Sequence, residues 1–252
     1  MAKEQTMTQM TLTAVGLGPG DPELLTIKGM RTLQQANVVF APFNVKTGES
    51  VAIGIAEPWL NRDQQQIVPL ELEMVRYAGK LTDVWAATAN QIVTAMQTYA
   101  QVHRVDSVNA VYLILGDPSL YGTFTYIAAQ LTESDVAVSV IPGVMSFAAG
   151  AAVAQFPLAV MDERVAIVPA SYEDKRETLR QTLAEFDVVI LMKVGRVLPE
   201  VLDVLADLNL LVNSIYVEKV GMADERAIVG LTDIPRERGP YFSLVIVRKP
   251  NV

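Results

Sequence analysis

Short apolar runs rich in β-branched residues alternate with longer amphipathic segments, and this alternation limits the possible folds more than any other feature of the chain. In the first half, the predicted strands are Thr11–Leu17, Ala36–Phe40 and Ala110–Leu115. The predicted helices are Leu24–Gln35, Ser50–Asn61 and Val84–Tyr99. Strands that alternate with helices predict a parallel α/β sheet. The almost wholly apolar run Ala110–Leu115 is typical of a central strand covered on both faces.

In the second half, strands and helices alternate at first, but the last predicted strands follow one another without helices between them. Its predicted helices are Phe124–Leu131, Val144–Ala154, Lys175–Phe186 and Leu198–Leu205, and its first predicted strands are Ala137–Ile141, Val165–Val168 and Val188–Met192. The late strands Ser214–Val217 and Ser243–Arg248, with Asp224–Val229 as a further candidate, follow one another without helices, which predicts a mixed sheet. We therefore expect two α/β domains, residues 1–118 with a mainly parallel sheet and residues 119–252 with a mixed sheet, and a ligand cleft between them.

The composition excludes several kinds of site. The 252 residues include no cysteine, which excludes disulfides, zinc–thiolate sites, iron–sulfur clusters and cysteine nucleophiles. His103 is the only histidine and lies in a polar stretch, so we expect it to be exposed and predict no metal site. The net charge of −8 disfavours broad nucleic-acid binding but permits a locally basic pocket for an anionic small molecule.

The chain shows no sign of export or membrane insertion. Residues Met1–Met10 are polar and lack an apolar signal core. No stretch approaches the roughly 18 uninterrupted apolar residues of a membrane helix. Together with the absence of cysteine, this fits a cytoplasmic protein without a membrane partner.

Glycine-rich segments follow several predicted strands. Gly16–Pro22 (GLGPGDP) joins a strand to a helix, but its glycine spacing differs from the dinucleotide fingerprint G-x-G-x-x-G, and no phosphate-loop lysine follows. Leu115–Gly122 (LGDPSLYG) follows the most apolar strand, at the position where open α/β sheets bind ligands. Its carboxylate, Asp117, would serve ribose hydroxyls, an amine or the amides of its own loop. A tight turn and a helix cap remain alternative interpretations of these two segments.

Two later segments resemble the first two in kind. Pro142–Gly150 leads from a strand into a helix of small residues, which would allow close approach of an adenosine or of another helix. Leu191–Arg196 ends a strand with Met192, Lys193 and Arg196, although a methionine at a strand end usually belongs to a core. The four segments together predict one ligand site.

These four segments, in this order and spacing, resemble the tetrapyrrole methyltransferase family. Its G-x-G-P-G-D-P-x-L-L-T motif is matched by Gly16–Thr26, its G-D-P loop by Gly116–Pro118 and its P-G-V/I loop by Pro142–Val144. Within the family, the chain is similar to the branch that methylates precorrin-2 or cobalt-factor II at ring carbon 20 in cobalamin biosynthesis. The segments that carry this finer similarity are Val38–Pro42, Val189–Val194 and Tyr241–Lys249.

The resemblance implies an S-adenosylmethionine site in the cleft between two domains, a tetrapyrrole substrate and a homodimer. Carried over residue by residue, the implied cofactor contacts are Pro19, Leu115, Gly116, Asp117, Leu120, Met145, Ser146, Met192, Val220 and Gly221. The uroporphyrinogen methyltransferases of the family have an aspartate base after the second strand, where this chain has Pro42. This difference argues against that activity.

A methyl group bound to a sulfonium is already electrophilic, and a meso carbon of a reduced tetrapyrrole is already electron-rich, so no strong protein base is required before attack. Tyr121 and Tyr241 are weak candidates for handling the proton that leaves afterwards, and the catalytic residue is otherwise unknown. The many ring carboxylates require cations, for which Lys46, Lys193, Arg196 and Lys219 are candidates because they follow predicted strand ends.

Other functions remain open at this point. Relatives in the family methylate other corrin positions, a modified histidine of elongation factor 2 or a ribosomal RNA ribose, although the acidic charge weighs against RNA. An NAD-dependent dehydrogenase is disfavoured by the glycine spacing and by the lack of an acidic residue after the second strand. A non-catalytic binding or assembly module is the remaining alternative.

Overall fold

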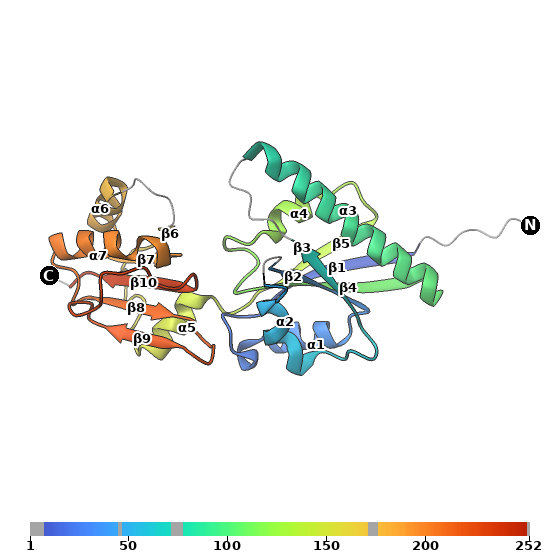
Figure 1. Ribbon diagram of the computed structural model, residues 1–252, viewed down its shortest axis with the longest axis horizontal. Helices are drawn as coiled ribbons and strands as arrows, with labels where there is room; N and C mark the ends of the chain where they lie inside the picture. The colour runs from blue at the N-terminus through green and yellow to red at the C-terminus, as the bar shows by residue number, and fades with distance from the viewer. Residues whose placement is uncertain (1–7, 45–46, 72–77, 171–175, 251–252) are drawn as a thin grey trace, which may run out of the picture. The chain divides into compact units, whose positions relative to one another are not determined.

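A computed structural model describes residues 8–44, 47–71, 78–170 and 176–250 (Figure 1). The chain divides into two compact units, Met1–Val144 and Met145–Val252, and each contains its own five-stranded sheet. The predicted fold of two α/β domains is confirmed. Among the described residues, no helix has the length and apolar character that a bilayer span requires.

The sheet of the first unit consists of parallel strands in the order β3-β2-β4-β1-β5. Its strands are β1 Gln9–Gly16, β2 Val38–Phe43, β3 Gln66–Glu71, β4 Ser107–Ile114 and β5 Val136–Ile141. Its helices are α1 Ile27–Gln34, α2 Val51–Ala56, α3 Ala78–His103 and α4 Phe124–Gln130, with short 3-10 helices η1 Pro22–Leu24 and η2 Glu57–Trp59.

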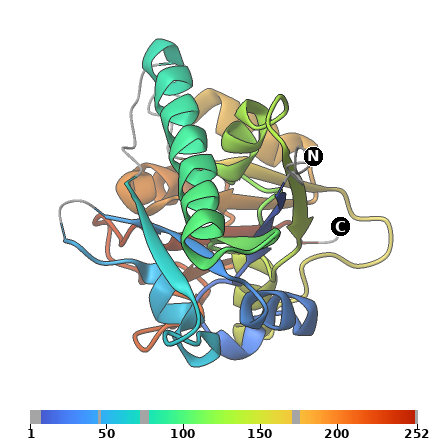
Figure 2. The ribbon, with the colours of Figure 1, turned by 90° about the vertical axis from the view of Figure 1, so that its right-hand side faces the viewer.

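Helices cover both faces of this sheet, as Figures 1 and 2 show for the long helix α3 on one face and for α1 and α2 on the other. One core joins α3 and α4 to Leu12, Tyr112 and neighbouring residues. The other joins α1 and α2 to Val15, Val111 and neighbours on the opposite face. From Val108 to Ile114, β4 is buried apart from Asn109, which confirms the prediction of a central strand covered on both sides.

Side-chain caps decide where the first helices begin. The sequence predicts one helix over Leu24–Gln35, whereas the structure has η1 followed by α1. Asp21 caps η1 by accepting the amide hydrogen of Glu23, and Thr26 caps α1 by accepting that of Gly29 at 3.0 Å. The predicted helix Ser50–Asn61 is likewise divided into two elements. The α-helix α2 ends at Ala56, and the 3-10 helix η2 follows around Pro58.

The structure places the domain boundary between Val144 and Met145 rather than near residue 118. The reason is that β5 pairs with β1 along the register from Met10↔Val136 to Val15↔Ile141 and so completes the first sheet. The sequence also failed to predict β3. This strand lies at the sheet edge and contains Pro69, a residue that weakens the strand pattern in sequence yet is tolerated at an edge.

The second unit has a mixed sheet, as predicted, and its strand order is β6-β7-β10-β8-β9. Its strands are β6 Val165–Pro169, β7 Val188–Met192, β8 Ser214–Glu218, β9 Arg226–Val229 and β10 Ser243–Arg248, and its helices are α5 Ser146–Val153, α6 Arg176–Glu185 and α7 Leu198–Asp207, with the 3-10 helix η3 Gly195–Val197. A core of β7, β8 and β10 residues packs against α6 and α7. On the other face, Gly150 of α5 lies over Val217.

Candidate functional site

Three glycine-containing loops meet at the carboxyl edge of the first sheet. Parallel strands end at the same edge, and β1 lies between β4 and β5. The loops that begin at Gly16, Leu115 and Pro142 are therefore neighbours, although the last two come more than 90 residues after the first in the sequence. The structure thus brings together three of the four segments that the sequence singled out.

Two of the glycines allow these loops to pack backbone against backbone. A Cβ atom on Gly16 would lie 2.5 Å from the Gly143 nitrogen and 2.7 Å from the Gly116 oxygen. A Cβ atom on Gly143 would overlap the Gly116 oxygen and lie 2.8 Å from the Gly16 carbonyl carbon. No side chain fits at either position, so both glycines serve close packing.

Gly116 has a different role from Gly16 and Gly143. Its φ is +68°, and no atom of the described residues lies within 4 Å of the position that a Cβ atom would occupy. Its backbone exchanges hydrogen bonds with Gly18, from the Gly116 amide at 2.8 Å and from the Gly18 amide at 3.3 Å. Gly116 is therefore held in place on one side and open on the other, which suits the close approach of a ligand.

Asp117 connects two of the loops. Its Oδ1 accepts the Ser119 amide hydrogen at 2.8 Å and also the Ser119 hydroxyl, and its Oδ2 accepts the Gly143 amide hydrogen at 3.0 Å. Burial raises the pKa of Asp117, but the hydrogen bonds from Ser119 and Gly143 outweigh burial and hold the pKa below its usual value. The carboxylate is thus charged and serves an amide of its own loop, one of the alternatives left open by the sequence, and it also serves the Gly143 amide of another loop.

The other predicted residues of the first unit lie in these loops. Pro19 is buried, and Leu115 and Leu120 are half-buried. Tyr121 is 44% exposed and has a φ of +53°, a strained value for a tyrosine. The sequence did not identify Ser119 as a partner of Asp117, although aspartate side chains in turns commonly accept the backbone amide hydrogen two residues further on. Lys46 lies outside the described residues.

The second unit brings most of the remaining predicted residues to one edge of its sheet. Because β7 and β8 are both antiparallel to β10, their carboxyl ends lie on either side of the start of β10. Met192 ends β7, and Lys219, Val220 and Gly221 follow β8. The Lys219 amide donates to the Phe242 carbonyl at 2.8 Å, which ties the end of β8 to the segment before β10.

The three described lysine and arginine candidates differ in their surroundings. Lys193 and Lys219 have φ values of +60° and +51°, which are unusual for residues with a side chain. Lys219 forms an ion pair with Asp224, which lowers the pKa of Asp224. Arg196 is exposed within η3.

Tyr241, at 57% exposure, lies just before β10 at the same edge, whereas Met145 and Ser146 lie at the start of α5.

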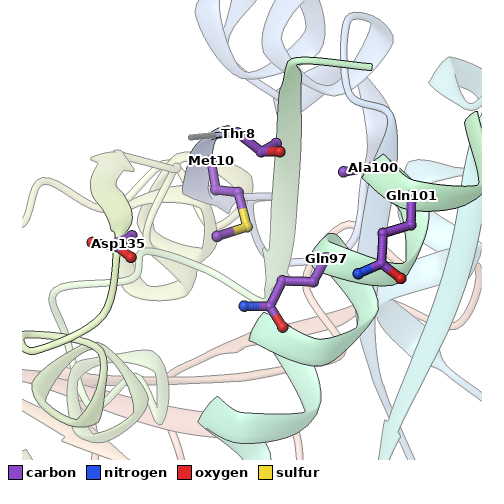
Figure 3. A pocket seen from close by; sticks show the side chains of 6 residues that line it. All are labelled: Thr8, Met10, Gln97, Ala100, Gln101 and Asp135. Carbon is purple, nitrogen blue, oxygen red and sulfur yellow. The ribbon is translucent and has the colours of Figure 1, made fainter. Parts of the chain in front are cut away.

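A hollow of about 400 Å³ lies at the opposite edge of the first sheet (Figure 3). This hollow is lined by Thr8 just before β1, Met10 at the start of β1, residues from the end of α3 and Asp135 before β5. It therefore lies at the amino ends of the strands, away from the glycine loops.

His103, at the end of α3, is exposed as predicted and stacks on Tyr99 with ring centroids 4.1 Å apart.

Comparisons with known proteins agree on one family. The chain is 34% identical over 244 residues to the cobalamin biosynthesis protein CobIJ of Mycobacterium tuberculosis, a match that covers 94% of this chain and 46% of CobIJ. It therefore spans about half the length of that relative. It is 31% identical to a precorrin-2 C(20)-methyltransferase of Sinorhizobium, with 94% of each chain covered.

Among solved structures, the chain resembles a uroporphyrin-III C-methyltransferase from Thermus thermophilus complexed with S-adenosyl homocysteine. The TM-score is 0.60 at 20% identity, and the match covers 95% of this chain and 97% of that one, which supports the fold. The family model described as Tetrapyrrole (Corrin/Porphyrin) Methylases matches residues 11–234. The chain therefore belongs to the tetrapyrrole methylase family.

Proposed function

We propose that this chain transfers a methyl group from S-adenosylmethionine to ring carbon 20 of precorrin-2 or of cobalt-factor II in cobalamin biosynthesis. The observation that carries this proposal is the match to the Sinorhizobium precorrin-2 C(20)-methyltransferase over 94% of both chains. The CobIJ match has higher identity but covers a longer protein, so it supports cobalamin biosynthesis without selecting a ring position.

The residues at the carboxyl edge of the first sheet fit the cofactor. Gly116 lacks a side chain at the position where the loop is open, and a Cβ atom there would fill that space. The half-buried side chains of Leu115 and Leu120 supply apolar surface beside Gly116 for a purine or a thioether. Pro19, Met145, Ser146, Met192, Val220 and Gly221 are the further contacts that we propose.

Asp117 would act on the cofactor through the loops. Both of its carboxylate oxygens accept hydrogen bonds from protein donors, and the residue is 6% exposed. It therefore holds the loop of Gly116 at a fixed distance from the loop of Gly143. This arrangement holds the open side of Gly116 in place before any ligand binds. It therefore reduces the entropy cost of ordering the loop on binding.

The chemistry requires positioning and the removal of one proton. S-adenosylmethionine, when bound, supplies an electrophilic methyl group. The protein would hold the ring carboxylates through Lys46, Lys193, Arg196 and Lys219, so that the meso carbon is in line with the methyl group. The hydroxyls of Tyr121 and Tyr241 are the candidates for accepting or relaying the proton that leaves afterwards.

The direct test offers the purified protein precorrin-2 and cobalt-factor II side by side with S-adenosylmethionine. Mass spectrometry should show a gain of one methyl group on at least one of them, and NMR of a ¹³C-methyl product should place the label at carbon 20. A label at another carbon would support the alternative, a family member specific for a different ring position. No methylation of either compound would contradict the proposal. The homodimer implied by the resemblance and the cytoplasmic location that fits the composition remain predictions for sedimentation and cell fractionation.

A further inference from the structure

The segment Gly239–Phe242 is fixed between two parts of the second unit. It lies directly before β10, at the edge where β7 and β8 end. This segment carries Tyr241, and the adjoining 3-10 helix η3 carries Arg196. Both residues belong to the substrate side of the proposed site.

Gly195 of η3 contacts one side of the segment. The Gly239 amide donates to the Gly195 carbonyl at 2.8 Å. A Cβ atom on Gly195 would overlap the Pro240 oxygen and lie 2.8 Å from the Gly239 oxygen. The backbones of the two segments are therefore in direct contact, and a movement of Gly239–Phe242 would displace the residue that precedes Arg196.

Tyr216 of β8 supports the other side of the segment. A Cβ atom on Gly239 would overlap the Tyr216 hydroxyl oxygen, so this hydroxyl lies directly against the Gly239 backbone. The same hydroxyl donates to Glu218 Oε2 at 2.7 Å. Glu218 Oε1 lies 3.7 Å from the Arg226 guanidinium, and the Glu218 side chain is only 16% exposed. Ser243 completes the support by donating its hydroxyl to the Pro240 carbonyl at 2.7 Å.

Burial and the neighbouring Glu218 carboxylate raise the pKa of the Tyr216 hydroxyl. The phenol therefore remains a hydrogen-bond donor at any pH at which the enzyme would work. The Glu218 carboxylate fixes the orientation of this hydroxyl, and the buried ring of Tyr216, at 2% exposure, fixes its location. The contact surface offered to Gly239 is consequently rigid.

We infer that Tyr216 and Glu218 are positioning residues, which hold Gly239–Phe242 against η3 and thereby place Tyr241 and Arg196 for binding of the tetrapyrrole. This inference rests on the proposed function, because the substrate side of the site is defined by it. Neither residue needs to touch the substrate. Loss of the pair would let the segment move and would weaken substrate binding more than cofactor binding.

The decisive variant is Tyr216→Phe, which keeps the ring and removes the hydroxyl. Its matched control is Tyr112→Phe, because Tyr112 is also a buried tyrosine on an interior strand, but its hydroxyl has no hydrogen-bond partner of ordinary geometry among the described residues. Glu218→Gln is the conservative variant, since its amide oxygen still accepts from Tyr216. Ser243→Ala is a second disrupting variant in case Tyr216→Phe does not fold.

The first readout is hydrogen exchange of the Gly239 amide and needs no substrate. In Tyr216→Phe and Ser243→Ala it should exchange roughly tenfold faster, while Tyr112→Phe and Glu218→Gln remain close to wild type. Unchanged exchange in Tyr216→Phe, or in Ser243→Ala if Tyr216→Phe does not fold, would overturn the inference that this segment is held from the Tyr216 side.

The second readout is kinetic. Tyr216→Phe should raise the KM for the tetrapyrrole roughly tenfold, with the S-adenosyl homocysteine Kd within about twofold of wild type. Faster exchange with an unchanged KM would overturn the positioning role. If the wild-type protein methylates neither ring compound, the proposed function fails, and the same comparison is made on binding of a stable polycarboxylate porphyrin. Equal affinity of wild type and Tyr216→Phe for that porphyrin would also overturn the inference.

Discussion

The Asp117 carboxylate accepts the backbone amide hydrogen of Gly143 at 3.0 Å, although Gly143 lies 26 residues further along the chain. This hydrogen bond joins the loop after β4 to the loop after β5. Gly16, at the end of the strand between them, packs against both loops. The three loops therefore form one structural unit, and a change in any of them should affect the others.

Replacement of Asp117 by asparagine tests this connection. The side-chain NH₂ group would face either the Gly143 amide or the Ser119 amide, so one donor would lose its acceptor. We expect a loss of about 1–3 kcal/mol in the free energy of unfolding, measured by denaturant titration. Asp21→Asn is the control, because asparagine caps a helix as well as aspartate does, and it should change stability by less than about 0.5 kcal/mol.

The stabilisation by Asp117 should depend on pH in a defined direction. Its hydrogen bonds keep the pKa below the unfolded value of 3.8, so its contribution is fully present well above that value and is lost as pH falls through the folded pKa. The stability difference between wild type and Asp117→Asn should therefore be constant near neutral pH and decrease below about pH 5. A difference that grows on acidification would show that the pKa of Asp117 is raised in the folded protein.

Alanine substitutions at two glycines should have opposite effects. A Cβ atom on Gly143 would overlap the Gly116 oxygen, so Gly143→Ala must displace a loop backbone and should cost more than about 2 kcal/mol. Gly54 lies within α2, and no atom in the described part of the chain lies within 4 Å of its added Cβ atom, so Gly54→Ala should stabilise the protein by about 0.5–1 kcal/mol. Thermal unfolding of both variants, with calorimetric titration of S-adenosyl homocysteine, would check this. Full cofactor affinity in Gly143→Ala would argue against the three-loop site.

Tyr112→Phe should leave stability unchanged or increase it. Burial raises the pKa of Tyr112 to about 12, and the nearby Thr123 lowers this pKa by a smaller amount. Among the described residues, the Tyr112 hydroxyl has no hydrogen-bond partner of ordinary geometry. Removing a buried hydroxyl without a partner eliminates a desolvation cost, so we expect a gain of up to about 1 kcal/mol. A loss larger than 1 kcal/mol in denaturant titration would indicate that the hydroxyl is hydrogen-bonded in solution.

Arg196→Ala should weaken substrate binding selectively. Arg196 is exposed in η3, which follows the carboxyl end of β7, and its guanidinium can bind a ring carboxylate there through two hydrogen bonds. We expect the KM for the tetrapyrrole to rise roughly tenfold while the calorimetric Kd of S-adenosyl homocysteine remains unchanged. Arg104→Ala, an exposed arginine before β4 at the other edge of the first sheet, is the charge-matched control. Equal losses for both ligands in Arg196→Ala would remove this residue from the substrate side.

The sequence by itself determined the local elements and the family. Apolar periodicity predicted the strands from β4 to β10 and the helices between them, because burial on one face or on both faces leaves a repeat that can be read along the chain. The motifs Gly16–Thr26, Gly116–Pro118 and Pro142–Val144 were sufficient to identify tetrapyrrole methylases, which the family match confirms.

Tertiary structure decided which of these segments meet. The sequence ended the first domain near residue 118, but the pairing of β5 with β1 extends it to Val144. It left several partners open for Asp117, and the strand order selected Gly143 as one of them. It gave no sign that Tyr216 supports Gly239. Strand order and loop packing depend on contacts between distant residues, and such contacts leave no periodic pattern in a single sequence.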